Sequence, residues 1–298
     1  MEPPSRPFAA SLRHHVEPLP GIASVSASDR GAHCGATGSE RVHMRTRDVD
    51  QIERRPAGGP ATPKISVITV VRNCAATLGR TIESVIWQLG DDAEYVIVDG
   101  ASTDGTIGVI KAYEDRLACW VSEPDRGIYD AMNKALALAR GEWVIFLGAD
   151  DELKPCLQAV ARELIDSRTV YYGDVEIAAS GAISGRKFNR YRLMQENICH
   201  QAIFYPRSVY RAKRYDTNIG MLADHRYNIE LWGSGTRFVH INQVISRFND
   251  AGASSRDSSY FEPFKMATIR SSFGPLYYAV KMSRTMLVRL IKGRRGSP

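Results

Sequence analysis

The sequence predicts an α/β fold in which a mostly parallel β-sheet carries helices on both faces. Short apolar runs typical of buried strands alternate with segments whose apolar residues recur at helical spacing, starting at Lys64. The first run, residues 65–71, is apolar almost throughout instead of alternating, which is typical of a parallel strand buried on both faces. These two patterns favour a parallel sheet covered by helices.

The elements follow in order along the chain. After the strand at 65–71, a helix is expected over 77–89, because Leu78, Ile82 and Val85 share one helical face. Further strands are expected at 95–98, 117–121 and 141–147, with helices at 106–113 and 128–139. After residue 151 a helix near 157–165 precedes shorter strands at 170–172, 202–205 and 238–248. We therefore expect a mixed α/β second half laid against the first.

Composition suggests three regions. Residues 1–63 are rich in Pro, Gly, Ser, Ala, Arg and His without hydrophobic periodicity, so a disordered N-terminal arm is expected. Residues 64–270 are expected to fold as one domain with halves at 64–153 and 154–270. Residues 271–298 form a basic C-terminal tail. Five scattered cysteines lack disulfide or zinc spacing, which indicates free thiols in a reducing, cytoplasmic location.

The net charge of +6 is located in the tail, not in the body. Its six cations are Lys281, Arg284, Arg289, Lys292, Arg294 and Arg295. The near-neutral remainder argues against a nucleic-acid partner. Two interpretations of the tail stay open: peripheral contact with an anionic membrane, or a solvated helix. The sequence has no run of about 18 apolar residues, so no segment is expected to span a bilayer.

Polar residues follow each of the first four expected strands. They occupy 72–73, 99–106, 122–127 and 148–151. In open α/β sheets, ligands bind beyond the carboxyl ends of the strands, so these segments are candidates for one site. Acidic loops would repel phosphate unless a cation lay between them. Mg²⁺ or Mn²⁺ held by Asp150 and Asp151 would resolve that conflict for a diphosphate ligand.

Four ordered motifs in this region point to a known family. They are SVITVVRN at 66–73, VDGASTDGT at 98–106, SEPDRGIYDAMNK at 122–134 and FLGADD at 146–151. Together they closely resemble the bacterial family 2 glycosyltransferases that assemble capsular polysaccharide, exopolysaccharide and glycolipid sugars. Segments 172–175, 198–205 and 222–224 are similar to a branch that adds deoxy sugars such as fucose to mycobacterial phenolic glycolipids.

The resemblance implies a GT-A fold and an activity. The chain is expected to transfer a sugar from a nucleotide-diphosphate donor to a hydroxyl of a saccharide or glycolipid acceptor, with inversion, in cell-envelope or exopolysaccharide biosynthesis. By resemblance, Asp99 accepts a hydrogen bond from the base, while Asp125 and Gly127 lie near the ribose and diphosphate. The other nucleotide-sugar contacts that it implies are Thr69, Val71, Asn73 and Asp150.

The metal motif departs from the family pattern. The family has Asp-x-Asp, and Gly148 stands where the first aspartate is usual. Asp150 matches the second aspartate and is the expected ligand of Mn²⁺ or Mg²⁺, with Asp151 in support. Part of the ligation would then pass to water, to the donor diphosphate or to His200, because Mg²⁺ usually keeps several waters.

Three residues of the second half complete the predicted site. Asp224 matches the family position of the base that takes the acceptor proton; as an alternative, it caps a helix beginning near His225. His200 and Trp232 are candidates for donor or acceptor contact, against the alternative that His200 is a hydrogen-bonded core residue. A competing function is a non-catalytic nucleotide-sugar-binding protein with a degenerate metal motif. A dinucleotide-dependent oxidoreductase is disfavoured, because no GxGxxG follows the first strand.

Overall fold

The computed structural model describes residues 42–43, 62–220, 223–250 and 262–294 of the chain. Apart from residues 42–43 and 62–63, the arm expected at 1–63 lies outside this range, as do the last four residues of the tail. Residues 42–43 form a two-residue strand, β1 (Val42–His43), which the sequence did not predict and which pairs in parallel with β4 (Cys119–Ser122).

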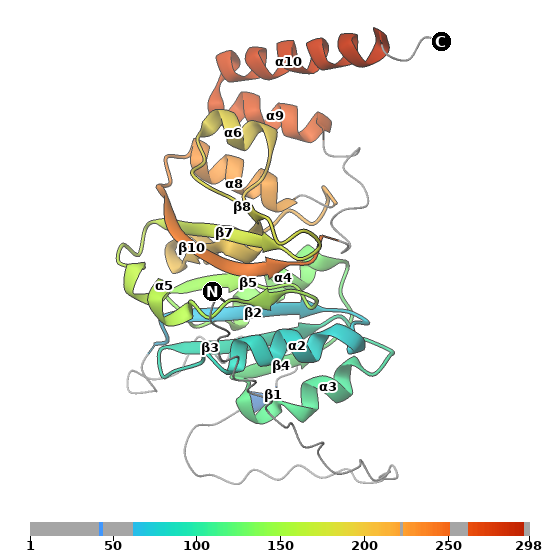
Figure 1. The fold of residues 1–298 in the computed structure, drawn as a ribbon, viewed down its shortest axis with the longest axis vertical. Helices are drawn as coiled ribbons and strands as arrows, with labels where there is room; N and C mark the ends of the chain where they lie inside the picture. Colours follow the sequence, from blue (N-terminus) through green and yellow to red (C-terminus); the bar gives the residue numbers. More distant parts are fainter. Residues whose placement is uncertain (1–41, 44–61, 221–222, 251–261, 295–298) are drawn as a thin grey trace, which may run out of the picture. The chain divides into compact units, whose positions relative to one another are not determined.

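The first half consists of repeated strand–helix units (Figure 1). In order after β1 they are β2 (Ile65–Val71), α2 (Ala75–Ile86), β3 (Ala93–Asp99), α3 (Thr106–Ala112), η2 (Glu114–Arg116), β4, α4 (Ile128–Leu138) and β5 (Trp143–Phe146). β2 pairs in parallel with both β3 and β5, and β3 pairs in parallel with β4. This confirms the predicted parallel sheet, with element ends displaced by up to three residues.

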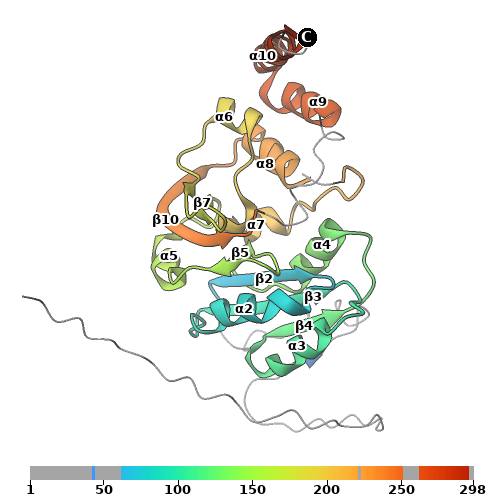
Figure 2. The ribbon, with the colours of Figure 1, turned by 45° about the vertical axis from the view of Figure 1, so that its right-hand side comes forward.

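The second half is mixed, as expected. Its elements are β6 (Glu152–Leu153), α5 (Leu157–Glu163), β7 (Val170–Ile177), β8 (Ile183–Ser184), α6 (Arg190–Gln195), η3 (His200–Ala202), β9 (Ile203–Pro206), α7 (Arg207–Tyr210), α8 (Ala223–Gly233), β10 (Phe238–Phe248), α9 (Glu262–Phe273) and α10 (Pro275–Arg294). α9 packs against both α8 and α10 (Figure 2).

One sheet runs through both halves in the order β1-β4-β3-β2-β5-β9-β7-β10-β6, with β8 paired to β7. β9 is antiparallel to both β5 and β7, and thereby joins the parallel first half to the parallel β7–β10 pair. β10 then pairs antiparallel with β6, the strand that directly follows the loop 147–151. This last pairing brings the end of β10 back to the end of β5.

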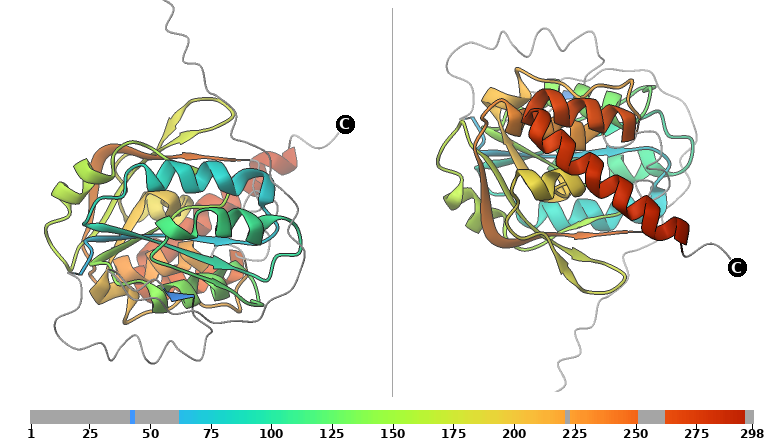
Figure 3. Two further views of the ribbon diagram at one scale, coloured as in Figure 1. Left: turned by 90° about the horizontal axis from the view of Figure 1, so that it is seen from below. Right: turned by 90° about the horizontal axis from the view of Figure 1, so that it is seen from above.

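Apolar residues cover both faces of the sheet. Along β2, Val67 and Val71 pack with α2 and α3 on one face, whereas Ile68 packs with α4 and α8 on the other. α2 and α3 therefore lie opposite α4 across the sheet (Figure 3). Since both faces are filled, the carboxyl edge of the strands is left to carry polar side chains.

Candidate active site

A cavity of about 310 Å³ opens beside the carboxyl ends of β2 and β5 and the end of β10. Its lining comes from five stretches of chain, within 70–74, 125–132, 146–151, 200–201 and 248–249. These stretches include parts of three of the four sequence motifs. The predicted edge of the sheet thus forms one hollow that also receives residues of the second half.

Asp150 presents its carboxylate to this cavity. It is half-buried, and Asn249 Nδ2 donates a hydrogen bond of 2.9 Å to its Oδ2. No described residue donates a hydrogen bond to its Oδ1. One oxygen is therefore held by protein and the other is available to a ligand.

Asp151 is placed differently, although it is the adjacent residue. Only 1% of it is exposed. Its Oδ1 accepts from the Asn249 amide at 2.8 Å, and its Oδ2 accepts from Gln201 Nε2 at 2.8 Å and the Gly148 amide at 3.1 Å. Burial raises the pKa of the Asp151 carboxyl, an effect that the hydrogen bonds from Asn249 and Gln201 oppose. Asp151 thus lines the cavity but joins three chain segments, with both of its acceptor oxygens occupied.

The glycine at 148 is explained by this arrangement. A Cβ at Gly148 would lie 2.5 Å from Asp151 Oδ2 and 3.2 Å from Asp150 Oδ1. An aspartate at this position would displace the Asp151 carboxylate and add a second charge beside it. The departure from Asp-x-Asp is therefore coupled to the inward orientation of Asp151.

Asp99 organises the turn after β3 and does not line the cavity. It is fully buried, and its Oδ2 accepts from the Ser102 amide at 3.0 Å and from Ser122 Oγ at 2.6 Å. Ser102 Oγ donates to the other oxygen. In this conformation the carboxylate joins the ends of β3 and β4 and is closed to an external base.

The remaining predicted nucleotide contacts of the first half divide into two groups. Val71 and Gly127 line the cavity, as does Asp125, whose Oδ1 accepts from the Gly127 amide at 2.8 Å. Thr69 does not, because it is fully buried with its hydroxyl 2.9 Å from Tyr95 Oη. Asn73 does not line the cavity either: it is exposed with a positive φ of 53°, and its Oδ1 accepts from the Thr103 amide at 2.8 Å.

Asp224 lies in the first turn of α8 and is buried. Its Oδ1 accepts from Tyr129 Oη at 3.0 Å, and its Oδ2 accepts from Asn197 Nδ2 at 2.7 Å. Burial acts to raise the pKa of Asp224, but its contacts with His200 and the hydrogen bond from Tyr129 outweigh it and leave the pKa below its usual value. Asp224 is therefore ionised at neutral pH, but does not itself line the cavity.

His200 lies between Asp224 and the cavity. It begins η3 and lines the cavity, and its Nδ1 is 3.6 Å from Asp224 Oδ2. Trp232 lies elsewhere: its ring stacks on Phe238 with centroids 4.7 Å apart, and it packs against the core. Trp232 is thus partly buried against the core and does not line the cavity.

Three polar residues of the site were missed by the sequence analysis. Gln201 and Asn249 hold the two aspartates, and Arg72 lines the cavity as an exposed cation. Asn249 directly follows the strand at 238–248, so applying the strand-end rule to the second half would have found it. Arg72 and Gln201 lie within segments already singled out, but as single residues they carry no distinctive signal.

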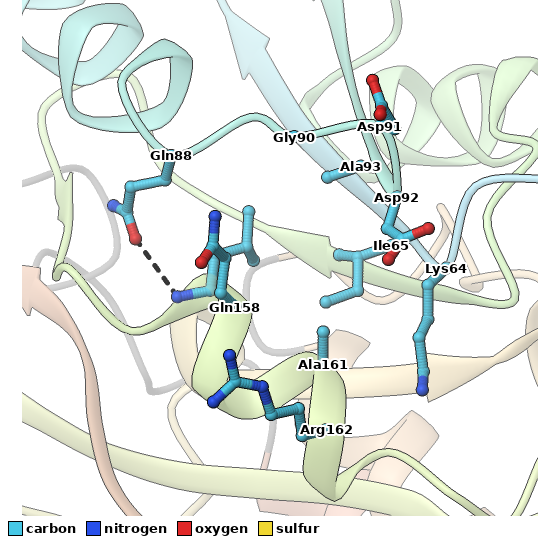
Figure 4. A pocket seen from close by; sticks show the side chains of 11 residues that line it. Lys64, Ile65, Gln88, Gly90, Asp91, Asp92, Ala93, Gln158, Ala161 and Arg162 are labelled. Carbon is cyan, nitrogen blue, oxygen red and sulfur yellow. Dashed lines mark hydrogen bonds between the residues drawn. The ribbon is translucent and has the colours of Figure 1, made fainter.

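A second cavity, of about 340 Å³, lies at the opposite edge of the sheet (Figure 4). Acidic Asp91 and Asp92 line it together with basic Lys64 and Arg162. It adjoins the amino ends of β2 and β3, where parallel α/β sheets do not usually place their ligands. The first cavity is therefore the better candidate for an active site.

Two negative observations apply to the described part of the chain. In it, no three His, Cys, Asp or Glu side chains lie close enough together to hold a metal ion by themselves. None of its helices combines the length and apolarity needed to cross a membrane.

Comparison with known proteins agrees with the fold. The model of the family "Glycosyl transferase family 2" matches residues 66–225, more than half of the chain. A PGL/p-HBAD biosynthesis glycosyltransferase from Mycobacterium bovis (strain BCG / Pasteur 1173P2) is 34% identical over 223 residues, which cover 70% of this chain and 86% of that relative.

Solved structures show the same fold at low sequence identity. S. aureus TarS residues 1–349, in complex with UDP-GlcNAc, matches with a TM-score of 0.60 and 17% identity over 73% of this chain and 69% of that one. A mannosyltransferase from Pyrobaculum calidifontis, in complex with GDP-Man and Mn²⁺, matches with a TM-score of 0.53 and 18% identity over 84% and 88%. The fold is thus that of the GT-A glycosyltransferases.

The sheet, its strand-end cavity and these matches define the protein as a glycosyltransferase. The chain belongs to glycosyl transferase family 2.

Proposed function

We propose that the enzyme transfers a sugar, with inversion, from a nucleotide-diphosphate donor to a hydroxyl of a saccharide or glycolipid acceptor in cell-envelope or exopolysaccharide biosynthesis. The observation that carries this proposal is the Asp150 carboxylate, which faces a cavity at the carboxyl edge of the sheet together with Arg72 and His200. The printed name of the mycobacterial relative, which places it in PGL/p-HBAD biosynthesis, supports a glycolipid acceptor.

The donor nucleotide is proposed to bind along the ends of β2 and β4. Val71 supplies an apolar wall, and Asp125 and Gly127 are placed for ribose and diphosphate contact. Arg72 adds a cation that offsets the negative charge of the diphosphate beside Asp125. Asp99 is proposed to act indirectly, by fixing the turn that shapes this end of the cavity.

A divalent cation, Mn²⁺ or Mg²⁺, fits the residues present. Hard cations take carboxylate and phosphate oxygens and keep several waters, so one protein carboxylate and a donor diphosphate form a sufficient set. Asp150 Oδ1 would be that protein ligand, while the saturated carboxylate of Asp151 holds the loop. When bound, the cation would neutralise charge on the departing nucleoside diphosphate.

On the acceptor side, Asp224 is proposed as the carboxylate that drives removal of the acceptor proton. It is ionised, and Tyr129 and Asn197 fix its orientation. A base on this side and a leaving group beside Asp150 would act on opposite faces of the sugar, as inversion requires.

We also propose that the enzyme acts in the cytoplasm, in peripheral contact with an anionic membrane surface through α10. Leu276, Val280 and Met286 of this helix are exposed. Lys281, one of the tail cations, is buried and donates to Gln195 Oε1 at 3.2 Å, so it does not face solvent. An exposed apolar side on a helix that also carries the exposed Arg284 supports an in-plane helix at a lipid surface.

Turnover by an Asp150 variant tests the proposal. Release of nucleoside diphosphate from UDP-, GDP- and dTDP-sugars would be measured with Mn²⁺ and with p-nitrophenyl glycosides as hydroxyl acceptors. Asp150→Ala should lower the rate by about 10²-fold or more, since the carboxylate of this loop that keeps an oxygen available to a ligand is lost. Asp91→Ala, in the opposite cavity, is the matched control and should keep the wild-type rate.

Full turnover by folded Asp150→Ala would overturn the role assigned to Asp150. Binding of a nucleotide sugar by wild-type protein, without release from any donor, would favour the non-catalytic binding protein instead.

A further inference from the structure

We propose that Asn228 and Tyr205 are positioning residues for Asp224, which they orient through the side-chain amide of Asn197. This inference rests on the proposed function, keeps Asp224 as the base, and adds residues that set the direction of its carboxylate. It starts from three side-chain hydrogen bonds, the amide network, which join Tyr205 to Asn228, Asn228 to Asn197 and Asn197 to Asp224.

Asn197 bridges two residues of one helix. Asp224 and Asn228 are four residues apart on α8, so their side chains lie on the same side of the helix. Asn197 lies between α6 and η3; its Nδ2 donates to Asp224 Oδ2 at 2.7 Å, and its Oδ1 accepts from Asn228 Nδ2 at 2.9 Å. A single amide group therefore spans one turn of α8 and contacts the base at one end.

Tyr205 closes the amide network at its other end. It lies in β9 and is 1% exposed, and its hydroxyl donates to Asn228 Oδ1 at 2.8 Å. Asn228 is fully buried, so its amide depends on partners within the protein. Those partners hold both ends of the amide, since Tyr205 contacts its oxygen and Asn197 contacts its nitrogen.

The chemistry of these groups gives the amide network one direction. A carboxylate only accepts hydrogen bonds, so Asn197 must present its NH₂ group to Asp224 and its oxygen to Asn228. Asn228 must then present its own NH₂ group to Asn197, and its oxygen faces Tyr205, whose hydroxyl can donate. Reversing either amide would bring two oxygens or two NH₂ groups together and leave hydrogen bonds unmade. Asn228 and Tyr205 therefore help to fix the amide that faces the base.

This fixed amide bears on catalysis through the direction of the carboxylate. Asp224 Oδ2 accepts from Asn197 and its Oδ1 accepts from Tyr129, so the carboxylate is restrained from two sides. An ionised carboxylate has about four acceptor sites, so these two donors do not saturate it. A base must lie within hydrogen-bond reach of the proton that it takes, and a displacement of about 1 Å can lower a rate about 10²-fold. Loss of Asn228 should therefore slow the reaction, although Asn228 does not line the cavity.

The test measures kcat in the nucleoside diphosphate release assay for Asn197→Ala, Asn228→Ala and the double variant. Asn197→Ala should lower kcat by about 10–10²-fold, because a hydrogen bond to the charged base is lost, and Asn228→Ala by about tenfold. The double variant should be no slower than Asn197→Ala, because Asn228 acts through Asn197. The Kd for nucleoside diphosphate with Mn²⁺ should stay within about threefold of wild type in all three, which separates positioning of the base from general damage to the fold.

Tyr205→Phe is the milder variant, since it removes one hydroxyl and keeps the ring. It should lower kcat by about threefold, less than Asn228→Ala, because Asp224 still favours the observed orientation of Asn197. If Asn228→Ala does not fold, Tyr205→Phe decides the question, and a wild-type kcat in it overturns the inference.

Tyr210→Phe is the matched control. Tyr210 is also 1% exposed, and its hydroxyl donates to the Gly141 carbonyl, outside the amide network. The variant loses a comparable hydrogen bond but should keep kcat within about 1.5-fold of wild type, since the base stays in place.

Several results would overturn the inference. They are a wild-type kcat in folded Asn228→Ala, losses that multiply in the double variant, a loss of nucleotide affinity as large as the loss of kcat, or equal losses of kcat in Tyr205→Phe and Tyr210→Phe. The proposed function fails in a different way, through wild-type protein that releases no nucleoside diphosphate from any donor.

Discussion

Asp150 and Asp151 are adjacent carboxylates with opposite surroundings. Asp150 has one oxygen open to the cavity, whereas Asp151 is enclosed by donors from Gly148, Gln201 and Asn249. A charge inside a protein is tolerated where hydrogen bonds replace water, which accounts for the buried position of Asp151. We infer that Asp150 interacts with the donor and that Asp151 maintains the loop that presents it.

At the scale of single residues, the Gly148→Asp variant tests whether Asp151 maintains the loop while Asp150 faces the donor. Although it would restore the Asp-x-Asp pattern, it should lower stability by roughly 1–3 kcal/mol, because the new Cβ would displace a buried hydrogen-bonded carboxylate. Urea unfolding measures the change. Gly108→Asp, at an exposed α3 position with open space around it, is the control and should cost less than about 1 kcal/mol.

A Gly148→Asp variant that is as stable as wild type and binds Mn²⁺ more tightly would contradict this account. It would mean that Asp151 can rotate outward and serve as a ligand.

Residue types at strand ends could be predicted from the sequence, but the directions of their side chains could not. The strand-end rule led to Asp99, Asp125 and Asp150, yet it does not distinguish an aspartate that faces a ligand from one that holds a turn. Asp99 is enclosed by two serines, Ser102 in the turn that follows it and Ser122 at the end of β4, 23 residues away along the chain. Such hydrogen-bond partners depend on the tertiary packing of segments far apart in the sequence, and the local sequence pattern does not specify that packing.

At the scale of elements, the strands with apolar runs were predicted, whereas the long helix α9, the second half of β7 and the shortest strands were not. The apolar run at 65–71 is β2, and the strand expected at 238–248 is β10. β6 and β8 have two residues each, which is too few to display the hydrophobic periodicity of a strand. α6 is short and polar, and its signal is the Asn189 cap, whose side chain accepts from the Arg192 amide at 2.8 Å.

α10 provides the prediction at this scale. Leu276 and Val280 are 73% and 41% exposed and four residues apart, so they share a helical side; Met286 is 57% exposed. Replacing all three by Ser should lower partitioning onto phosphatidylserine vesicles about tenfold or more, since apolar area is lost from the lipid contact. Vesicle co-sedimentation measures the change.

Ile165→Ser is the control for this experiment, because Ile165 is an equally apolar residue, 83% exposed, between α5 and β7. It should leave partitioning unchanged. Equal vesicle binding by wild type and the triple variant would instead support the interpretation of α10 as a solvated helix.

At the scale of the whole molecule, the cavity is assembled where the two halves of the sheet meet. β9 joins β5 to β7, and the β10–β6 pairing returns Asn249 to Asp150 and Asp151 across 98 residues of sequence. Asn249 lies beyond the family match at residues 66–225. The alternation of strands and helices predicted the parallel half, but the antiparallel insertion of β9 depends on long-range pairing that strand-by-strand patterns do not encode.

The same assembly suggests how nucleotide and metal would be linked. A diphosphate beside Asp125 and Asp150 meets two carboxylates, and among the described cavity residues Arg72 is the only lysine or arginine that opposes them. One arginine leaves an excess of negative charge when the diphosphate is bound. Nucleotide affinity should therefore depend strongly on a divalent cation held by Asp150.

Thermal unfolding with UDP, GDP and dTDP, each with and without Mn²⁺, measures this dependence on the cation held by Asp150. One nucleotide should raise the Tm by roughly 5 °C or more at about 100 times its Kd. The shift should need Mn²⁺, and Asp150→Ala should abolish it while Asp91→Ala should not. A shift of equal size without Mn²⁺, or in Asp150→Ala, would contradict it, as would the absence of any shift in the wild-type protein.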